Sequence, residues 1–237
     1  MPIYRIADLN VEVNPKFKIC RKRLESYAVK SNESGKTDIA ISVSDDEIRE
    51  RLRLSDNLSE QGAEDVLILS KFCNAVLDGF DGFFFHSSCL ELDGEGYVFS
   101  AVSGTGKSTH TALWRRHFGN MVTMINDDKP VIRKCDGKFS AYGTPRMGKA
   151  DIGTNTKAPV KAVYILQRAE ENTAVRVLPS HVMKQLLEAT VIDVERSRME
   201  KLLELLDEFF KETPLFLLGC NMDESAVMTA YNAANGG

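Results

Sequence analysis

The sequence lacks the paired cysteines that mark a zinc site or a disulfide framework. Its five cysteines are scattered and odd in number, and they include no C-x-x-C pair, so neither kind of site is indicated. No charged-then-apolar leader opens the chain, and the longest apolar runs, such as PLFLLGC, are much too short to cross a bilayer. We therefore expect a cytoplasmic protein without a membrane partner.

An excess of positive charge is also missing. The formal net charge is −4 at pH 7, and the only basic cluster is KFKICRKR, which is more typical of the solvated face of a helix than of a binding patch. This charge balance argues against an electrostatic footprint for nucleic acid. We expect no nucleic-acid partner.

The chain is long enough to bury a full core, with 237 residues of which 43% are hydrophobic. From about residue 83 onward, candidate strands and helices alternate, which favours an α/β core. Before that, YRIADLNVEVN and DIAISVS alternate like strands, and residues 60–80 have a helical apolar period. We predict an N-terminal α+β subdomain or sheet extension over residues 1–80 and a second domain over residues 81–237, with SNESGKT as a loop.

Several elements of the second domain follow from local pattern. GFFFHSSCLEL and GYVFSAV are predicted as adjacent strands joined by the turn DGEG, and KSTHTALWRRHF as a helix that ends near Gly119. MVTMIN, DDKPVIRKC, KFSAYG, VKAVYILQR and TAVRVLP are further strand candidates, and SHVMKQLLEAT, VERSRMEKLLELLDEFF and DESAVMTAYNAA are helices. In the second of these helices the predicted core face is Met199, Leu202, Leu203, Leu206 and Phe210.

The stretch SGTGKST is close to the phosphate-binding loop G-x-x-x-x-G-K-[ST], but Ala101 stands where its first glycine is expected. In such a loop the glycines let the backbone approach a phosphate, Lys107 reaches the β/γ oxygens, and Ser108 ligates Mg²⁺. Ala101 replaces no phosphate ligand, so we expect a bent but functional motif; a glycine-rich turn without a ligand is the alternative. The predicted nucleotide contacts are Ser103, Gly104, Thr105, Gly106, Lys107, Ser108 and Thr109.

Two adjacent carboxylates, Asp127 and Asp128, follow the strand candidate MVTMIN. If that strand lies parallel and close to the strand before the loop, both emerge at the same sheet edge as the phosphates. One could hold Mg²⁺ and the other could take a proton from an attacking hydroxyl, although such a pair is otherwise often only a turn. To act as a base, an aspartate needs a pKa raised by its partner carboxylate and by burial.

A histidine, His86, closes the apolar run FFFH on the strand before the loop strand. From the residues alone, such a histidine is more typical of a core or edge position. The other histidines, His110, His117 and His181, lie in or at the start of predicted helices, and we expect no special role for them.

FHSSCLELDGEGYVFSAVSGTGKST, followed by NDD, resembles the nucleotide-binding core shared by bacterial HPr kinase/phosphorylases and ATP-dependent phosphoenolpyruvate carboxykinases. The resemblance covers about residues 83–135. It implies a P-loop-containing mixed β-sheet core with flanking helices, and ATP and Mg²⁺ as cofactors. The HPr kinases are also homo-oligomers, but no subunit interface can be read from this sequence. The resemblance also implies that His86 lies beside the metal or the transferred phosphate, that Asp128 is the base, and that Asp127 lies nearer the metal.

The chain also departs from both families. It has no room for the substrate domain of a carboxykinase, and the HPr kinase signature after the aspartate pair is replaced by YGTPRMGKADIGTNTKAP. That composition suits a surface loop, where substrate contacts concentrate. Arg146, Lys149 and Lys157 could meet the γ-phosphate or an anionic acceptor, or could belong to a solvated loop. NTK faintly resembles a carboxykinase NTR stretch, which makes Lys157 a candidate.

The sequence therefore predicts an ATP- and Mg²⁺-dependent kinase that transfers the γ-phosphoryl group to a hydroxyl. The acceptor is a hydroxyl-bearing small molecule or a serine of a peptide or carrier protein. A nucleotide-gated regulatory module without phosphoryl transfer and a simple ATPase with water as acceptor are the alternatives.

Overall fold

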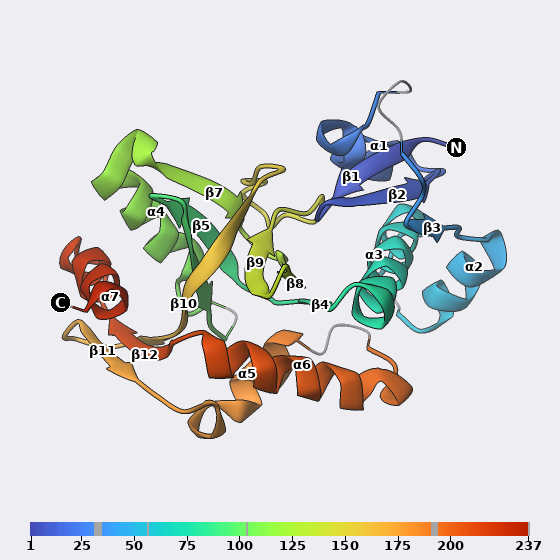
Figure 1. Ribbon diagram of the computed structural model, residues 1–237. Coiled ribbons are helices and arrows are strands. Elements are labelled where there is room, and N and C mark those ends of the chain that lie inside the picture. The colour runs from blue at the N-terminus through green and yellow to red at the C-terminus, as the bar shows by residue number, and fades with distance from the viewer. Residues whose placement is uncertain (31–34, 56, 103, 191–193, 237) are drawn as a thin grey trace.

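The computed structural model describes residues 1–30, 35–55, 57–102, 104–190 and 194–236. Its strands form two sheets, one of three strands and one of nine. Figure 1 shows the small sheet with α1, α2 and α3 on one side of the molecule, the large curled sheet with α4 and α7 on the other, and α6 along the bottom, reaching beneath α3. Among the described residues, no helix combines the length and the apolar character that crossing a membrane requires.

The N-terminal part forms its own sheet. β1 (Ile3–Ile6) pairs antiparallel with β2 (Leu9–Val13), which pairs parallel with β3 (Ile39–Ile41). The helices are α1 (Lys18–Leu24), α2 (Asp45–Arg53) and α3 (Glu60–Gly79). The strand patterns and the helical period over 60–80 are confirmed. Helix α2 was not predicted, although the reciprocal cap between Ser44 and Glu47 that begins it is legible in the sequence.

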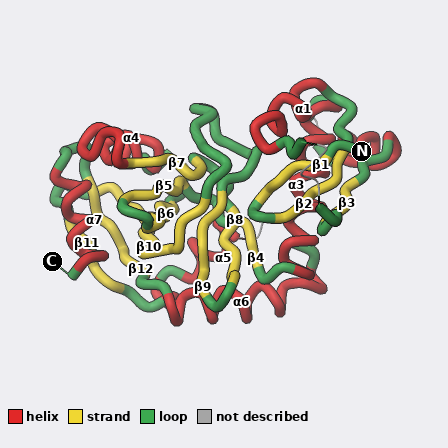
Figure 2. The backbone as a smooth tube through the Cα atoms, turned by 45° about the horizontal axis from the view of Figure 1, so that its top comes forward, coloured by secondary structure: helices red, strands yellow, loops and turns green. Residues whose placement is uncertain are grey.

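The large sheet is mixed and curled. Its order is β4 (Gly82–Phe84), β8 (Val131–Cys135), β9 (Lys138–Tyr142), β10 (Lys157–Arg168), β6 (Glu95–Ser100), β5 (Ser88–Leu92) and β7 (Val122–Asn126), with β12 (Leu215–Cys220) beside β10 and β11 (Thr173–Arg176) beside β12. The first residues of β10 pair with β9 and the later ones with β6 and β12. The single long strand β10 therefore joins the two halves of the sheet. Figure 2 shows how the sheet curls between these halves.

Helices cover both faces of this sheet. α4 (Lys107–Phe118) and α7 (Ser225–Asn235) lie on one face, and α5 (Met183–Thr190) and α6 (Met199–Glu212) on the other (Figure 1). Successive side chains of β6 point to opposite faces of the sheet, each of which has its own apolar core. The ring centroids of Phe99 and Trp114 of α4 are 5.5 Å apart, whereas Val98 belongs to the cluster that contains Phe209 of α6. The predicted α/β class is confirmed at this level.

Three local predictions need correction. GFFFHSSCLEL is not one strand: β4 and β5 lie far apart in the sheet, because the amides of residues 85–87 donate to Pro130, Ala189 and Asp128 carbonyls instead of continuing a ladder. PLFLLGC forms strand β12, which was not predicted. On α6, Leu203 is 43% exposed, and the buried face includes Leu205 and Phe209 instead.

The small sheet packs on the large one through a shared apolar cluster. Phe72 and Val76 of α3 belong to the same cluster as Phe84 and Tyr142 of the large sheet. Buried Arg133 of β8 joins them further, donating from Nη1 to the Ala7 carbonyl at 2.6 Å and from Nε to the Phe80 carbonyl at 3.0 Å. The N-terminal residues are therefore an integral part of the packed molecule.

Candidate functional site

The strand order brings three separate segments to one sheet edge. β5 pairs antiparallel with both β6 and β7, so β6 and β7 run parallel to each other with β5 between them. Ser88 at the start of β5 is level with Phe99 near the end of β6, and Cys89 is level with Asn126 at the end of β7. The segment before β5 therefore lies between the loop that follows β6 and the aspartates that follow β7.

The glycine-containing loop leads directly into α4. Gly104 and Gly106 have φ of +81° and +120°, and a Cβ on either would meet nothing within 4 Å, so the backbone conformation itself favours glycine. The first amides of α4 have no acceptor within the helix. Ala101 lies outside the positive-φ region, so this loop does not need the missing glycine. Ser103 lies outside the described residues, and Ser108 and Thr109 are exposed.

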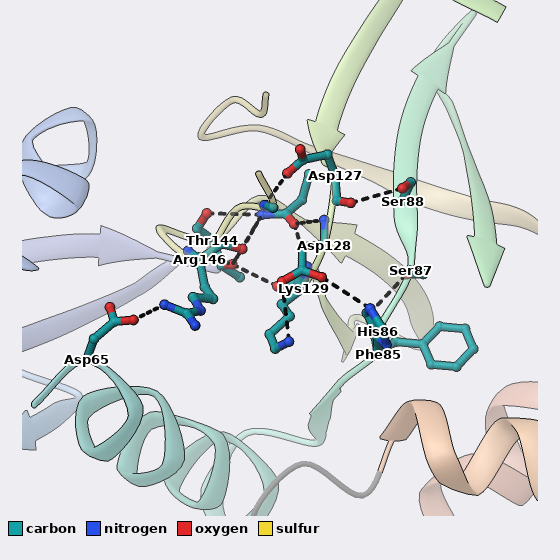
Figure 3. A network of polar contacts seen from close by, with 12 residues as sticks. Asp65, Phe85, His86, Ser87, Ser88, Asp127, Asp128, Lys129, Thr144 and Arg146 are labelled. Carbon is teal, nitrogen blue, oxygen red and sulfur yellow. Dashed lines mark hydrogen bonds and ion pairs between the residues drawn. The ribbon is translucent and has the colours of Figure 1, made fainter. Parts of the chain in front are cut away.

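Lys107, His86 and Asp128 meet beside this loop. The His86 Nε2 atom lies 3.4 Å from Lys107 Nζ and 3.2 Å from Asp128 Oδ1, and Figure 3 shows the His86–Asp128 contact. Lys107 Nζ is also 3.4 Å from the Ala101 carbonyl. One ring nitrogen cannot accept from the lysine and donate to the carboxylate at the same time. His86 therefore has two alternative partners.

The electrostatics of Asp128 differ from the expectation. Burial alone raises the pKa of Asp128, but the hydrogen bond from His86 and the charge of Lys129 outweigh it, so the pKa is lowered overall. The prediction of a raised pKa was wrong, because His86 and Lys129 lower the pKa by more than burial raises it. Asp128 is consequently an ionised hydrogen-bond acceptor at neutral pH. The neighbouring Asp127 makes a separate contact, in which its Oδ1 accepts from the Gly148 amide at 2.6 Å.

The positive charges of two lysines, Lys107 and Lys129, interact with the Asp128 carboxylate. Lys129 Nζ lies 3.3 Å from Asp128 Oδ2. Burial lowers the pKa of Lys107, and the Lys129 charge lowers it further, while Asp128 opposes both. The Lys107 ammonium belongs to the first turn of α4, where the helix dipole also favours an anion.

Asn126 holds the backbone of the aspartate pair in place. Its Oδ1 accepts from the amides of Asp128 at 2.9 Å and Lys129 at 2.6 Å, and its Nδ2 donates to the carbonyls of Thr144 and Arg146 at 3.1 and 3.2 Å. Sequence reasoning missed Asn126 and Lys129. The signal for Asn126 was present, because an asparagine that precedes such a turn commonly bonds to amides two and three residues later.

Arg168 is a further residue that sequence reasoning missed. From the end of β10 its Nη2 donates to the Gly104 carbonyl at 2.6 Å. A groove of about 500 Å³ borders the loop here, lined among others by Thr105, Arg168 and Asn221. No local signal could have found Arg168, since only the parallel pairing of β10 with β6 brings it to the loop.

Two of the three basic residues of the 142–159 segment pair with carboxylates of the N-terminal part. Arg146 pairs with Asp65 of α3, and Lys149 is exposed. Lys157 pairs with Asp8 at 2.5 Å. Lys157 lies eight residues before Ile165 on β10, and Ile165 is level with Ser100, the last residue of β6 before the loop. Roughly 26 Å of strand therefore separates Lys157 from the start of the loop. We correct the prediction of Lys157 as a nucleotide contact on this ground.

Only a few of the described side chains beside the loop could act as ligands of Mg²⁺. Within the described part of the chain, no group of three or more His, Cys, Asp or Glu side chains could hold a metal ion. Mg²⁺ bound with a nucleotide needs fewer, because it keeps waters and phosphate oxygens as ligands. The exposed Ser108 hydroxyl and the aspartate pair supply the oxygen donors that it prefers.

Fold and site together define a mixed α/β protein in which the lysine of a glycine-containing strand-to-helix loop lies beside a His–Asp pair. No protein-family model matches this chain, and no curated protein matches it. Among solved structures, it is similar to the Hpr(Ser) kinase/phosphatase from Coxiella burnetii, with a TM-score of 0.36 and 12% identity, covering 65% of this chain and 93% of that chain. This similarity is a distant structural relationship.

Proposed function

We propose that this protein is a kinase that transfers the γ-phosphoryl group of ATP to a hydroxyl acceptor. The proposal rests on one observation: His86 contacts both Lys107 and Asp128. The three residues come from separate segments of the chain, and the fold brings them together beside the loop. Phosphoryl transfer needs a phosphate cradle and an acceptor-orienting carboxylate close together.

In this proposal the loop and α4 bind the phosphates. The amides of the first turn and the Lys107 ammonium neutralise the β/γ oxygens. Arg168 fixes the loop through the Gly104 carbonyl, and the groove beside it is large enough for the base and ribose.

Asp128 orients the acceptor hydroxyl. Its lowered pKa makes it a weak base, which a loose transition state tolerates because little proton transfer is needed before the phosphoryl group moves. When Lys107 turns to the phosphates, His86 Nε2 is released to donate to Asp128 and hold the carboxylate in place. Nucleotide binding would thereby prepare the acceptor side of the site.

Mg²⁺ bound with ATP would be held by Ser108 and Asp127 and would neutralise charge on the phosphates. Thr105, Gly106 and Thr109 complete the proposed contacts to the nucleotide.

The test separates binding from transfer. Asp128→Asn is expected to lower kcat about 10²–10⁴-fold while leaving the Kd for ATP nearly unchanged, and Lys107→Ala is expected to weaken ATP binding itself. Calorimetric titration with ATP and a phosphoryl-transfer assay measure the two effects. Asp136→Asn, in an exposed hairpin turn, is the matched control. Full turnover by Asp128→Asn would refute its role.

A further inference from the structure

Two arginines converge on one carboxylate at the boundary between the N-terminal part and the candidate site. Arg23 Nη1 of α1 lies 2.5 Å from Asp65 Oδ2, and Arg146 Nη1 pairs with the same oxygen. The three side chains are half-buried, with 32%, 15% and 28% of Arg23, Asp65 and Arg146 exposed. One carboxylate oxygen thus faces two guanidinium groups.

This cluster leaves hydrogen-bonding capacity unused. A guanidinium presents five N–H donors in a fork that matches both oxygens of a carboxylate or phosphate. Arg146 Nε is buried and has no hydrogen-bond partner among the described residues. Burial and the neighbouring Arg23 charge both lower the pKa of Arg146, so a second anion here would relieve repulsion between the two arginines.

The cluster also borders a small apolar cavity. The cavity has a volume of about 50 Å³, and its wall includes Arg23, Asp65 and Arg146 together with Leu69, Phe72 and Thr144. The charged groups in its wall are the two arginines and Asp65, while most of the remaining lining is aliphatic or aromatic. A recess of this volume has room for one small charged group beside the arginines but not for a convex protein surface.

Hydrogen bonds join the backbone of Arg146 to the backbone of Asp128 through Asn126. Asn126 donates from Nδ2 to the Arg146 carbonyl at 3.2 Å and accepts at Oδ1 from the Asp128 amide at 2.9 Å. Thr144 Oγ1 donates to the Lys129 carbonyl at 2.7 Å. In the view of Figure 3, Asp128 lies between His86 on one side and the Arg146–Asp65 pair on the other.

We infer that Arg23 and Arg146 form the binding site for the anionic group of a small hydroxyl acceptor, a carboxylate or a phosphate carried beside the reacting hydroxyl. This inference rests on the proposed function for the identity of the ligand as an acceptor. Asp65 occupies the site in the absence of the acceptor and shares the two guanidinium groups with the anion when the acceptor binds.

Three probes with the same carbon skeleton test the inference: glycerol, glycerate and glycerol phosphate. Calorimetric titration of the whole protein, with a non-hydrolysable ATP analogue and Mg²⁺ present, is expected to detect binding of at least one of the two anions and no binding of glycerol. The stronger of the two anions identifies the preferred group. Equal binding of glycerol and the anions, or no binding of any probe, would overturn the inference.

Variants of the cluster have opposite expected effects. Arg146→Gln and Arg23→Gln are each expected to weaken anion binding about tenfold or more, and Arg146→Lys, which keeps the charge but loses the fork, is expected to fall between wild type and Arg146→Gln. Asp65→Asn removes the competing carboxylate and is expected to tighten anion binding. A purely structural ion pair predicts no such gain, so unchanged or weaker binding by Asp65→Asn contradicts the inference.

Two controls keep the outcomes separate. Arg49→Gln removes an exposed arginine that pairs with Asp46 on α2 and is expected to leave anion binding unchanged. Thermal unfolding checks that each variant is folded, and Arg23→Gln provides the test if Arg146→Gln does not fold. ATP binding is titrated in parallel: intact ATP binding without anion selectivity refutes this inference alone, whereas arginine-dependent anion binding without ATP binding refutes the proposed function alone.

Discussion

At the scale of single residues, His110 combines deep burial with a defined tautomer. It is 2% exposed in α4, and its Nε2 accepts from Trp114 Nε1 at 3.0 Å. This bond places the ring proton on Nδ1. Burial lowers the pKa of His110 to about 4, so the folded protein holds the ring neutral under conditions in which an unfolded chain protonates it.

This burial predicts an acid-sensitive free energy of unfolding. The unfolded histidine takes up a proton below about pH 6.5 and the folded one only near its lowered pKa, so stability is full above that range and falls as the pH decreases. Between about pH 7 and pH 5, His110 accounts for a loss of roughly 2 kcal/mol. Urea unfolding of the wild type and of His110→Gln measures it. An equal pH dependence in both proteins would contradict the assignment.

The residues of the candidate site differ in how far sequence could predict them. Gly104, Gly106 and Lys107 follow from a short motif, and the position of Asp128 follows from strand periodicity. Lys129 and Arg168 could not be predicted as members of the site, because neighbouring elements and long-range pairing determine what they contact. The lowered pKa of Asp128 was unpredictable for the same reason, since it depends on the tertiary contact with His86 and on the charge of Lys129.

At the scale of elements, close backbone packing fixes the segment between β9 and β10. A Cβ on Gly143 would lie 1.9 Å from the Thr154 carbonyl oxygen and 2.9 Å from that of Ile125 in β7. Both obstacles are backbone atoms, which cannot move aside without shifting the strand that carries the aspartate pair. Gly143 is therefore a packing requirement of the site.

The expected consequence is a marked difference between two glycine substitutions. Gly143→Ala should lower the free energy of unfolding by about 2 kcal/mol or more and should also reduce phosphoryl transfer. Gly79→Ala, in the last turn of α3 with nothing within 4 Å of its added Cβ, should be neutral or stabilising by up to about 1 kcal/mol. Urea titration compares the two. Similar stabilities would show that the loop can rearrange around a side chain.

Sequence patterns predicted those elements well that have one buried face, such as an amphipathic helix, or that contain a characteristic turn sequence. The turn at Asp93 and Gly94, with φ of +55° and +80°, and helix α4 are examples. The patterns failed where an apolar stretch is buried on all sides. GFFF and SCLEL are separated by only two residues but pair with different strands, and β12 has no alternation because both of its faces are covered.

At the scale of the whole molecule, the shared apolar cluster joins residues 1–80 to the large sheet. Phe72 of α3 packs edge-on against Phe84 of β4 at 5.8 Å, and Arg133 bridges the same boundary. Sequence composition could place a change of pattern near residue 80 but not this cluster, which depends on tertiary contact.

This packing predicts one cooperative unfolding transition. Trp114 is the single tryptophan and lies in the cluster between the large sheet and α4 and α7, so its fluorescence reports on the part distant from β1–β3. Circular dichroism reports on both parts. Urea transitions followed by the two signals should coincide, and an earlier transition seen only by circular dichroism would show that the N-terminal part unfolds alone.

The central claim is that Lys107, His86 and Asp128 form a centre that transfers the γ-phosphoryl group of ATP to the hydroxyl of an acceptor other than water. The most direct test incubates the protein with Mg²⁺, ATP labelled on the γ-phosphate and a panel of hydroxyl metabolites and small carrier proteins, with Lys107→Ala and Asp128→Asn alongside. The account predicts label on one acceptor, lost in both variants. ATP binding without transfer to any acceptor would instead indicate a nucleotide-gated module, release of label to water alone would indicate an ATPase, and either result would contradict the claim.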